Sequence, residues 1–266
     1  MKLKNISINN SPVNYIPSAQ LVQAAEIAYA LKRPLLLSGE PGTGKTDFAK
    51  YVAYNLADKG FLPEPLIFNT KSSSSAQDLF YYYDAVAHFR SNSTTTDNNS
   101  TENFIQLKAL GLAFAHAIGK DKLELSNIIT SKDVISGSPV GSVVLIDEID
   151  KAPRDFPNDL LNEIEQYQFE IKEINKKINL NDEQKKNVLL ILTSNFEKNL
   201  PEAFLRRCVY FHIEFPNAET LQKIIVQRLS IPTDKLSQLQ KRIDEFFMIR
   251  NDNPVQKKPS TSECLD

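Results

Sequence analysis

The chain has 266 residues, of which 41% are hydrophobic, and its formal net charge at pH 7 is −2. This length and apolar content allow one substantial α/β core and a small second unit. The near-zero net charge excludes a general electrostatic attraction to nucleic acid. The N-terminus lacks the apolar segment of a signal peptide, and no apolar run reaches the length of a membrane span, so we expect a soluble cytoplasmic protein.

Cysteines and histidines are few and scattered. Cys208 and Cys264 are too few and too scattered to predict a disulfide framework or a zinc site, so we expect free thiols. His88, His116 and His212 have no metal-ligand spacing among themselves, and we expect each to have a structural role.

Helical and strand patterns alternate along the chain, which is typical of parallel βαβ units. Apolar residues at helical spacing predict an amphipathic helix over residues 18–32, which Pro34 keeps from continuing. Short apolar runs then predict five strands, at residues 35–37, 66–68, 143–146, 188–192 and 209–215.

Two polar segments interrupt this alternation. Residues 91–103 are low in complexity and have no apolar anchor, so we expect a mobile surface loop. Residues 175–186 are charged and polar, and they predict the solvated tip of a hairpin, with a hairpin that contacts a partner as the alternative.

The segment 39–46 has the Gly-x4-Gly-Lys-Thr spacing of a phosphate-binding loop, between a strand and a helical pattern. Its glycines let backbone N–H groups point at phosphates, Lys45 supplies a positive charge, and the Thr46 hydroxyl can hold Mg²⁺. An ordinary glycine-rich turn is the alternative, but it does not account for the flanking strand and helix. The expected phosphate-binding residues are Glu40, Pro41, Gly42, Thr43, Gly44, Lys45, Thr46 and Asp47.

The third predicted strand ends in acidic residues. Its continuous apolar run is typical of a strand buried on both faces of a parallel sheet, and ligands bind beyond the carboxyl ends of such strands. We therefore expect Asp147 to hold Mg²⁺ through water and Glu148 to polarise an attacking water. Alternatively, the two acids only favour the N-terminus of the next helix, which leaves the buried strand unexplained.

The fourth strand ends at Asn195, at the same edge of the sheet. Its amide could hold the attacking water or contact the terminal phosphate, or it could cap a turn or helix. A short helical pattern then ends in Arg206 and Arg207. The helix dipole alone favours arginines there, whereas the functional interpretation is that one of them reaches the phosphates of a neighbouring subunit.

Residues 33–46, 145–153 and 200–207 together make the chain resemble an AAA+ ATPase, and more narrowly the bacterial MoxR-type branch. The resemblance implies a P-loop NTPase α/β fold, with a five-stranded parallel-sheet core, helices on both faces, and a small α-helical lid. It also implies ATP and Mg²⁺ as cofactors, in sites shared between the subunits of a ring, with six subunits expected.

The resemblance runs from about Tyr15 to the last residue, apart from residues 91–103 and 120–140. It implies an AAA+ nucleotide-binding core in residues 1–216 and a partial lid in residues 217–266.

Individual roles follow from the matching positions. Residues 39–46 would be the Walker A motif, Asp147 and Glu148 the Walker B motif, and Asn195 sensor 1.

Other positions imply contacts at the two ends of the nucleotide. The arginine finger would be Arg207, with Arg206 as the second choice, and Tyr15 and Ile16 would line the adenine. Ser262 stands where related proteins often have a sensor-2 arginine, and the lid helix expected there has few residues before the sequence ends. We expect either a shortened lid or one that a partner completes.

The resemblance implies ATP hydrolysis that remodels or activates a partner protein. Proteins with von Willebrand factor A domains, or effectors in bacterial defence or chaperone systems, are the implied partners. A non-hydrolysing nucleotide switch or assembly scaffold is a second hypothesis, because of the lid. A nucleic-acid motor is a third, although the sequence has no basic stripe interleaved with aromatic residues. A GTPase is disfavoured because the guanine-reading Asn-Lys-x-Asp motif is absent from the sequence.

Overall fold

The computed structural model describes residues 11–92, 100–119, 137–229, 231 and 236–252. In these residues, five strands form a parallel sheet in the order β2-β5-β8-β1-β9. The strands are β1 (Leu35–Ser38), β2 (Leu66–Asn69), β5 (Ser142–Asp147), β8 (Val188–Ser194) and β9 (Val209–His212). The predicted five-stranded α/β fold is thus confirmed.

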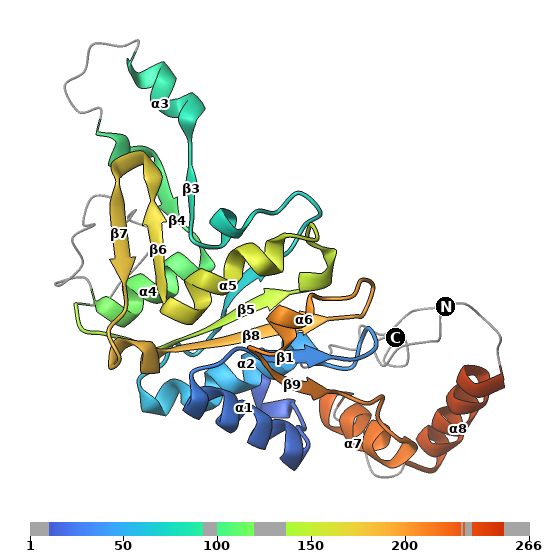
Figure 1. Ribbon diagram of the computed structural model, residues 1–266. Helices are drawn as coiled ribbons and strands as arrows, with labels where there is room; N and C mark the ends of the chain where they lie inside the picture. The colour runs from blue at the N-terminus through green and yellow to red at the C-terminus, as the bar shows by residue number, and fades with distance from the viewer. Residues whose placement is uncertain (1–10, 93–99, 120–136, 230, 232–235, 253–266) are drawn as a thin grey trace.

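Helices cover both faces of the sheet (Figure 1). On one face lie α1 (Ala19–Leu31) and α2 (Lys45–Leu56), and on the other lie α4 (Ala109–Ile118) and α5 (Phe156–Gln166). The central strands β1, β5 and β8 are buried on both sides, because their successive side chains point to opposite faces and helices cover each face, whereas the edge strands β2 and β9 are only partly buried. The structure therefore confirms the expected three-layer arrangement.

The α1 helix shows how local sequence sets an element's limits. The Ser18 hydroxyl accepts a hydrogen bond from the Leu21 amide at 3.2 Å, which caps the N-terminus. Lys32 takes a left-handed conformation at the C-terminus, with φ of 53°. The helix predicted over residues 18–32 is therefore confirmed, with its two end residues acting as caps.

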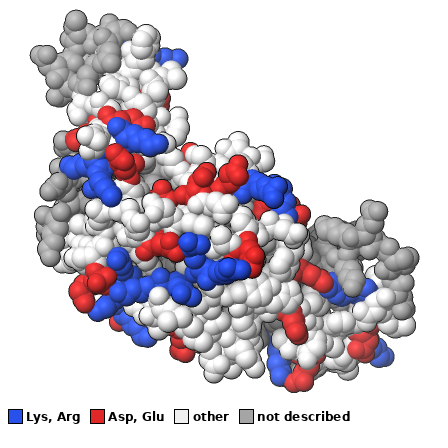
Figure 2. All heavy atoms as spheres, viewed as in Figure 1, with Lys and Arg blue, Asp and Glu red and all other residues white. Residues whose placement is uncertain are grey.

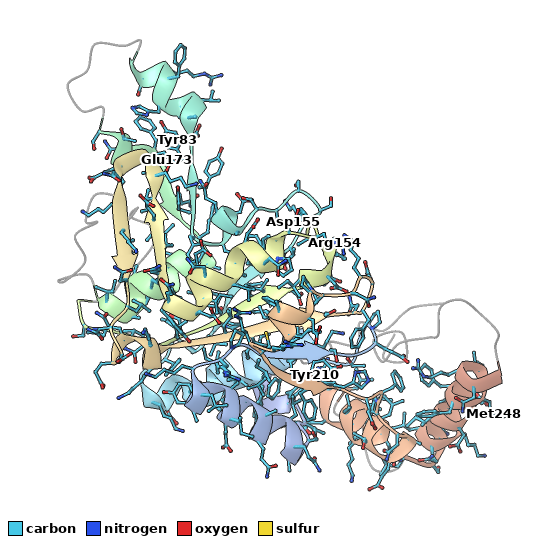
Figure 3. The ribbon with its side chains drawn as sticks, viewed as in Figure 1. Tyr83, Arg154, Asp155, Glu173, Tyr210 and Met248 are labelled. Carbon is cyan, nitrogen blue, oxygen red and sulfur yellow. The ribbon has the colours of Figure 1, made fainter. Side chains whose placement is uncertain are left out.

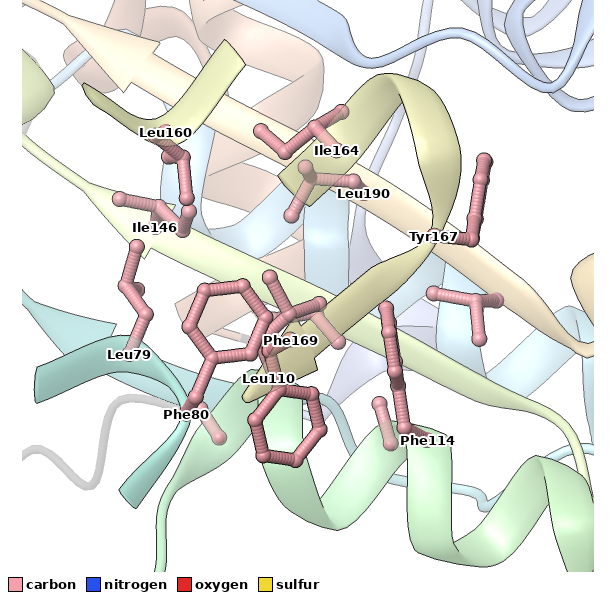
Figure 4. Close-up of a cluster of buried hydrophobic side chains, with 14 of the residues drawn as sticks. Leu79, Phe80, Leu110, Phe114, Ile146, Leu160, Ile164, Tyr167, Phe169 and Leu190 are labelled. Carbon is pink, nitrogen blue, oxygen red and sulfur yellow. The ribbon is translucent and has the colours of Figure 1, made fainter. Parts of the chain in front are cut away.

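A cluster of buried hydrophobic side chains, several of them aromatic, fills the core between the sheet and α4 and α5 (Figure 4). The rings of Phe80 and Phe169 stack with centroids 4.8 Å apart, and Phe114 meets Phe169 edge-on at 5.6 Å. Aromatic pairs in these geometries add to the stabilisation that burial provides. Because Phe169 belongs to a hairpin outside the sheet, this cluster fixes that hairpin to the core.

In the described residues, two antiparallel hairpins and the helix α3 (Ala85–Asn92) form an arm that projects beyond α4 and α5 (Figure 1). One hairpin pairs β3 (Tyr81–Tyr83) with β4 (Ile105–Leu107), and the other pairs β6 (Gln168–Ile171) with β7 (Lys176–Asn179).

The hairpins contact each other where Lys172, at the tip of the β6–β7 hairpin, donates a hydrogen bond from its amide to the Tyr81 hydroxyl at 3.2 Å. Burial raises the pKa of Tyr81 to about 12. Tyr83 and Glu173, from the two different hairpins, also lie on the arm (Figure 3).

Both polar segments differ in part from expectation. Residues 91–92 belong to α3 and residues 101–103 to a 3-10 helix, so the expected loop over 91–103 is wrong at both ends. Residues 93–99 lie outside the described part of the chain. A hairpin is present near residues 175–186, but its tip lies at residues 172–175 and its second strand extends over Lys176–Asn179.

The strand predicted over residues 209–215 is also shorter than expected. In the described residues β9 pairs only with β1, and β1 ends at Ser38, opposite His212. The Ile213 amide donates one last hydrogen bond to the Ser38 carbonyl at 2.8 Å. Residues 213–215 then leave the sheet because they have no further strand to pair with.

After the sheet, α7 (Ala218–Leu229) and α8 (Leu236–Asp252) pack together through Leu221, Ile225 and Ile243. The expectations about residues 257–263, Ser262 and Cys264 fall outside the described residues. In the described part of the chain, no helix is both long enough and apolar enough to cross a membrane.

The remaining helices are short. A single turn of α-helix, α6 (Glu202–Leu205), precedes β9. Turns of 3-10 helix are found at Pro12–Asn14, Ala57–Lys59, Ala76–Leu79, Thr101–Phe104, Ile149–Lys151, Lys172–Ile174 and Gln184–Asn187.

We expect Gly111→Ala to destabilise the protein. In a helix interior, alanine is normally favoured over glycine by about 1 kcal/mol. However, a Cβ atom at Gly111 would lie 2.0 Å from the Phe80 carbonyl oxygen, which a hydrogen bond from the Lys108 amide holds in place. Urea unfolding should show a loss of about 1–3 kcal/mol in the free energy of unfolding. As a control, Glu26→Ala replaces an exposed residue and should change the free energy of unfolding by less than about 0.5 kcal/mol. A stabilised Gly111→Ala variant would contradict this packing.

Candidate active site

A cavity of about 820 Å³ opens beyond the carboxyl ends of the central strands. Its volume is within the range of small-molecule sites. It is lined by the loop after β1, by the ends of β5 and β8, by the end of β9 and the segment that follows it, by residues at and before the start of α1, and by Thr220, Ile224 and Arg228 of α7. Among the predicted site residues, the cavity lining includes Tyr15, Ile16, Pro41, Gly42, Thr43, Gly44, Lys45, Thr46, Asp47, Asp147, Glu148 and Asn195.

The loop after β1 turns sharply into α2 at Gly44. This residue has φ of 86°, a conformation that side chains disfavour, and a Cβ atom there would lie 3.0 Å from the Tyr15 ring. Lys45 is the first residue of α2, so the loop ends at a helix N-terminus. Such a terminus presents unpaired N–H groups and a positive dipole, which together favour phosphate.

The Lys45 ammonium lies inside the loop, and the residue is only 7% exposed. Its Nζ donates hydrogen bonds to the carbonyl oxygens of Gly39 and Glu40, both at 2.9 Å. Burial lowers the pKa of Lys45, while the nearby Asp147 and Asp150 act in the opposite direction. The loop thus holds a cation in place at the position where phosphates would enter.

Asp147 and Thr46 meet at the edge of the sheet. The Thr46 hydroxyl lies 3.2 Å from Asp147 Oδ1 and 3.3 Å from Oδ2. The Thr193 hydroxyl donates to Asp147 Oδ1 at 2.6 Å and accepts from the Glu148 amide at 2.8 Å. A hydroxyl beside a carboxylate fits Mg²⁺, which takes oxygen ligands and leaves its other positions to phosphate oxygens and water.

Both carboxylate oxygens of Glu148 accept hydrogen bonds. Asn195 Nδ2 donates to Oε1 at 3.0 Å, and Lys151 Nζ donates to Oε2 at 2.5 Å. The bond to Glu148 raises the pKa of Lys151. The structure therefore brings the expected base and the expected sensor amide into direct contact.

Asp150 is a supporting residue that the sequence analysis did not single out. It is 2% exposed, and its Oδ2 accepts hydrogen bonds from the amides of Asn195 at 3.1 Å and Glu197 at 2.8 Å. Between them, Phe196 has φ of 60°, a conformation that non-glycine residues seldom adopt. Asp150 thus fixes the turn that carries Asn195, and its place in the acidic run after β5 was the available signal.

One side of the cavity is aromatic and includes Tyr15, which precedes α1. The Tyr15 ring packs on Phe48 and Tyr51, with centroids 5.8 and 5.7 Å away. Burial raises the pKa of Tyr15 above its ordinary value. Tyr15 and Ile16 offer an uncharged surface to the cavity.

Arg206 and Arg207 lie away from the cavity. Arg206 Nη2 contacts Glu202 Oε1 at 2.5 Å, while Arg207 contacts the Glu165 carboxylate and donates to the Ala203 carbonyl oxygen at 2.8 Å. Within one chain, neither guanidinium reaches the phosphate loop. Their expected role concerns a neighbouring subunit and stays a prediction.

Two arginines from the C-terminal helices were missed by the sequence analysis. Arg228 of α7 lines the cavity, and its Nη2 lies 2.6 Å from Asp47 Oδ2. Arg250 of α8 contacts the Glu40 carboxylate, which lies beside the cavity and not in its lining. The two residues of each pair lie 181 and 210 positions apart in the sequence, respectively, so no local pattern predicts these pairs.

His212, expected to be structural, also lies in the cavity wall. Its Nδ1 is 3.0 Å from the Ser38 hydroxyl, which donates a hydrogen bond to the Tyr210 hydroxyl at 2.7 Å. The histidine thus has both a structural partner and a position at the site.

Comparison with known proteins identifies one family. The model of the AAA family, "ATPase family associated with various cellular activities", matches residues 35–217. No curated protein matches the chain. Among solved structures, that of C. elegans PCH-2 aligns at 16% identity and a TM-score of 0.43, over 95% of this chain and 67% of that one.

We expect Thr193→Val to weaken the response of nucleotide binding to Mg²⁺. The change removes the hydroxyl that orients Asp147 and leaves the Glu148 amide without this partner. Losing a group that orients a metal ligand typically costs about tenfold or more in metal affinity. A Mg²⁺ titration of nucleotide binding measures the effect, and Thr193→Ser, which keeps the hydroxyl, should behave as wild type. Equal titrations for Thr193→Val and wild type would exclude this role.

Proposed function

The chain belongs to the AAA family of ATPases, and we propose that it binds ATP with Mg²⁺ in the cavity beyond β1, β5 and β8 and hydrolyses it. The observation that carries the proposal is the contact between Thr46 and Asp147 at 3.2 Å. It joins the phosphate loop to the acidic strand end, where a metal-bound triphosphate needs both.

Each group at this edge has a distinct task in the proposed reaction. The loop amides and Lys45 bind the phosphate oxygens, and Thr46 and Asp147 hold the metal. Bound Mg²⁺ neutralises negative charge on the phosphates. Glu148 takes the proton from an attacking water, and Asn195 orients the Glu148 carboxylate and the water.

The proposed site extends across a subunit boundary. AAA proteins commonly form oligomeric rings, and we infer that this chain does so as a homo-oligomer, with six subunits as the expected number. Arg207, with Arg206 second, would then contact the phosphates bound by the next subunit, where a planar guanidinium stabilises developing charge. Both side chains are at least 40% exposed in the single chain, so a neighbouring subunit can approach them.

The finer assignment rests on the sequence motifs. Residues 33–46, 145–153 and 200–207 support the MoxR-type branch and a protein partner that the ATPase remodels or activates. A partner with a von Willebrand factor A domain, or an effector in a bacterial defence or chaperone system, belongs to this proposal. So does the division into a core at residues 1–216 and a lid from residue 217, close to the start of α7 at Ala218.

A nucleotide switch that does not hydrolyse ATP is the second candidate. It is favoured by the hydrogen bonds that Asn195 and Lys151 make to Glu148, because each carboxylate oxygen that already accepts a hydrogen bond has one acceptor position fewer for an attacking water. Figure 2 gives no support to a nucleic-acid motor, since Lys and Arg intermingle with Asp and Glu on the face shown.

Two variants separate binding from hydrolysis. Lys45→Ala should abolish ATP binding, because the loop loses its cation. Glu148→Gln should bind ATP as wild type but turn over at least about 100-fold more slowly, since the amide accepts no proton. Equilibrium binding and phosphate release measure the two effects. Normal binding by Lys45→Ala would contradict the loop assignment, and wild-type turnover by Glu148→Gln would exclude Glu148 as the base.

The ring proposal predicts that turnover per chain rises with protein concentration. Arg207→Ala should remove that rise and lower the saturated rate by about 1000-fold, as is typical of a lost arginine finger. Lys172→Ala, on the arm, is the control. Tight ATP binding without turnover at any concentration would instead support the switch.

A further inference from the structure

Two carboxylates, Glu40 and Asp47, flank the loop that is proposed to receive a triphosphate. Glu40 is the second residue of the loop, and Asp47 lies in the first turn of α2. A carboxylate beside bound phosphate repels it, and the repulsion is stronger where water is partly excluded. Neutralising the two charges therefore favours phosphate binding at this loop.

Arg228 of α7 neutralises Asp47. The ion pair is 2.6 Å long, and the exposed fractions of the two side chains are 17% for Arg228 and 29% for Asp47. Lys50 also faces Asp47, but at 3.6 Å and with a more exposed side chain. Asp47 directly follows Thr46, the proposed metal ligand, so Arg228 acts one residue away from the metal.

Arg250 of α8 neutralises Glu40. Its side chain is 6% exposed, and its guanidinium carbon lies 3.5 Å from the centroid of the Phe215 ring. A cation over an aromatic face is stabilised there. On the same helix, Met248 is 64% exposed (Figure 3). Arg250 is thus held inward, between the loop and the segment that lines the cavity.

Glu40, which Arg250 contacts, also accepts a hydrogen bond from Lys45, the cation of the phosphate loop. The Glu40 carbonyl oxygen accepts hydrogen bonds from Lys45 Nζ and from the Thr43 hydroxyl, both at 2.9 Å. By fixing the Glu40 side chain, Arg250 therefore also fixes a carbonyl that positions Lys45.

Other ion pairs in the same helices differ from these two. Glu219 and Lys223 pair within α7, and Arg242 and Glu245 pair within α8, with all four side chains more than 60% exposed. Exposed ion pairs of this kind contribute little to stability. The pairs made by Arg228 and Arg250 are instead partly buried and join the C-terminal helices to the loop.

We propose that Arg228 and Arg250 are positioning residues that make affinity for Mg²⁺-ATP depend on the docking of α7 and α8 against the phosphate loop. They do so by neutralising Asp47 and Glu40. This inference rests on the proposed nucleotide binding at the same site. Undocking the helices exposes both carboxylates to the triphosphate and weakens its binding.

Charge substitutions at Arg250 test the first pair. Arg250→Met keeps an unbranched side chain against Phe215 but removes the charge, and we expect it to bind Mg²⁺ and a fluorescent ATP analogue about tenfold more weakly. Arg250→Lys keeps the charge and should bind within about twofold of wild type. Adding Glu40→Gln to Arg250→Met should restore binding, because the uncompensated carboxylate is gone. Arg242→Met, on the same helix, is the control and should bind as wild type.

The second pair is tested in parallel. Arg228→Met should weaken binding by about tenfold, Arg228→Met with Asp47→Asn should regain it, and Lys223→Met serves as the control on α7. Thermal melting of every variant, with and without nucleotide, separates loss of fold from loss of affinity.

Each outcome bears on one proposal. If wild type fails to bind the analogue, the proposed function is wrong. If wild type binds and the Arg→Met variants match their controls, the positioning role is overturned. If the variants bind weakly but the amide substitutions restore nothing, the arginines act through packing and the charge mechanism is likewise overturned.

Discussion

The contact between the Thr46 hydroxyl and the Asp147 carboxylate is the interaction on which the rest of the site depends. It exists because β8 alone separates β1 from β5 in the sheet, so the loop after one strand meets the acidic end of the other. Thr193, at the end of the intervening β8, donates its hydroxyl to the same carboxylate. The strand order therefore accounts for the site: three strand ends converge on one carboxylate, where a metal ion would share its negative charge with a bound triphosphate.

The site also concentrates like charges, and the structure balances them locally. Asp147, Glu148 and Asp150 lie near the buried Lys45 ammonium, while Lys151 binds the outer oxygen of Glu148. Cations from α7 and α8 meet the two carboxylates that flank the loop. Phosphates would thus enter a region in which each negative side chain already has a partner. The two ion pairs therefore couple the small C-terminal unit to the phosphate loop through charge. Apolar contacts hold the helices of that unit together.

Much of the fold could be predicted from local patterns, because five apolar runs and one glycine-rich loop encode the sheet and its edge. The strand alternation misled at Phe215, since the pattern continues after β1 has ended. The β3–β4 hairpin escaped prediction because its strands have three residues each. Contacts such as Arg250 with Glu40 join residues 210 positions apart, and only the packing of α8 brings them together. The sequence could therefore predict where the phosphate loop and the acidic residues lie, but not which cations neutralise the acidic residues.

The most direct test of the central claim is a crystal structure of the Glu148→Gln variant with Mg²⁺ and ATP. The account predicts phosphates within the loop at residues 39–46, Mg²⁺ about 2.1 Å from the Thr46 hydroxyl, and the Asp147 carboxylate bound to the ion directly or through one water. Triphosphate bound elsewhere, or a metal ion that contacts neither Thr46 nor Asp147, would contradict it.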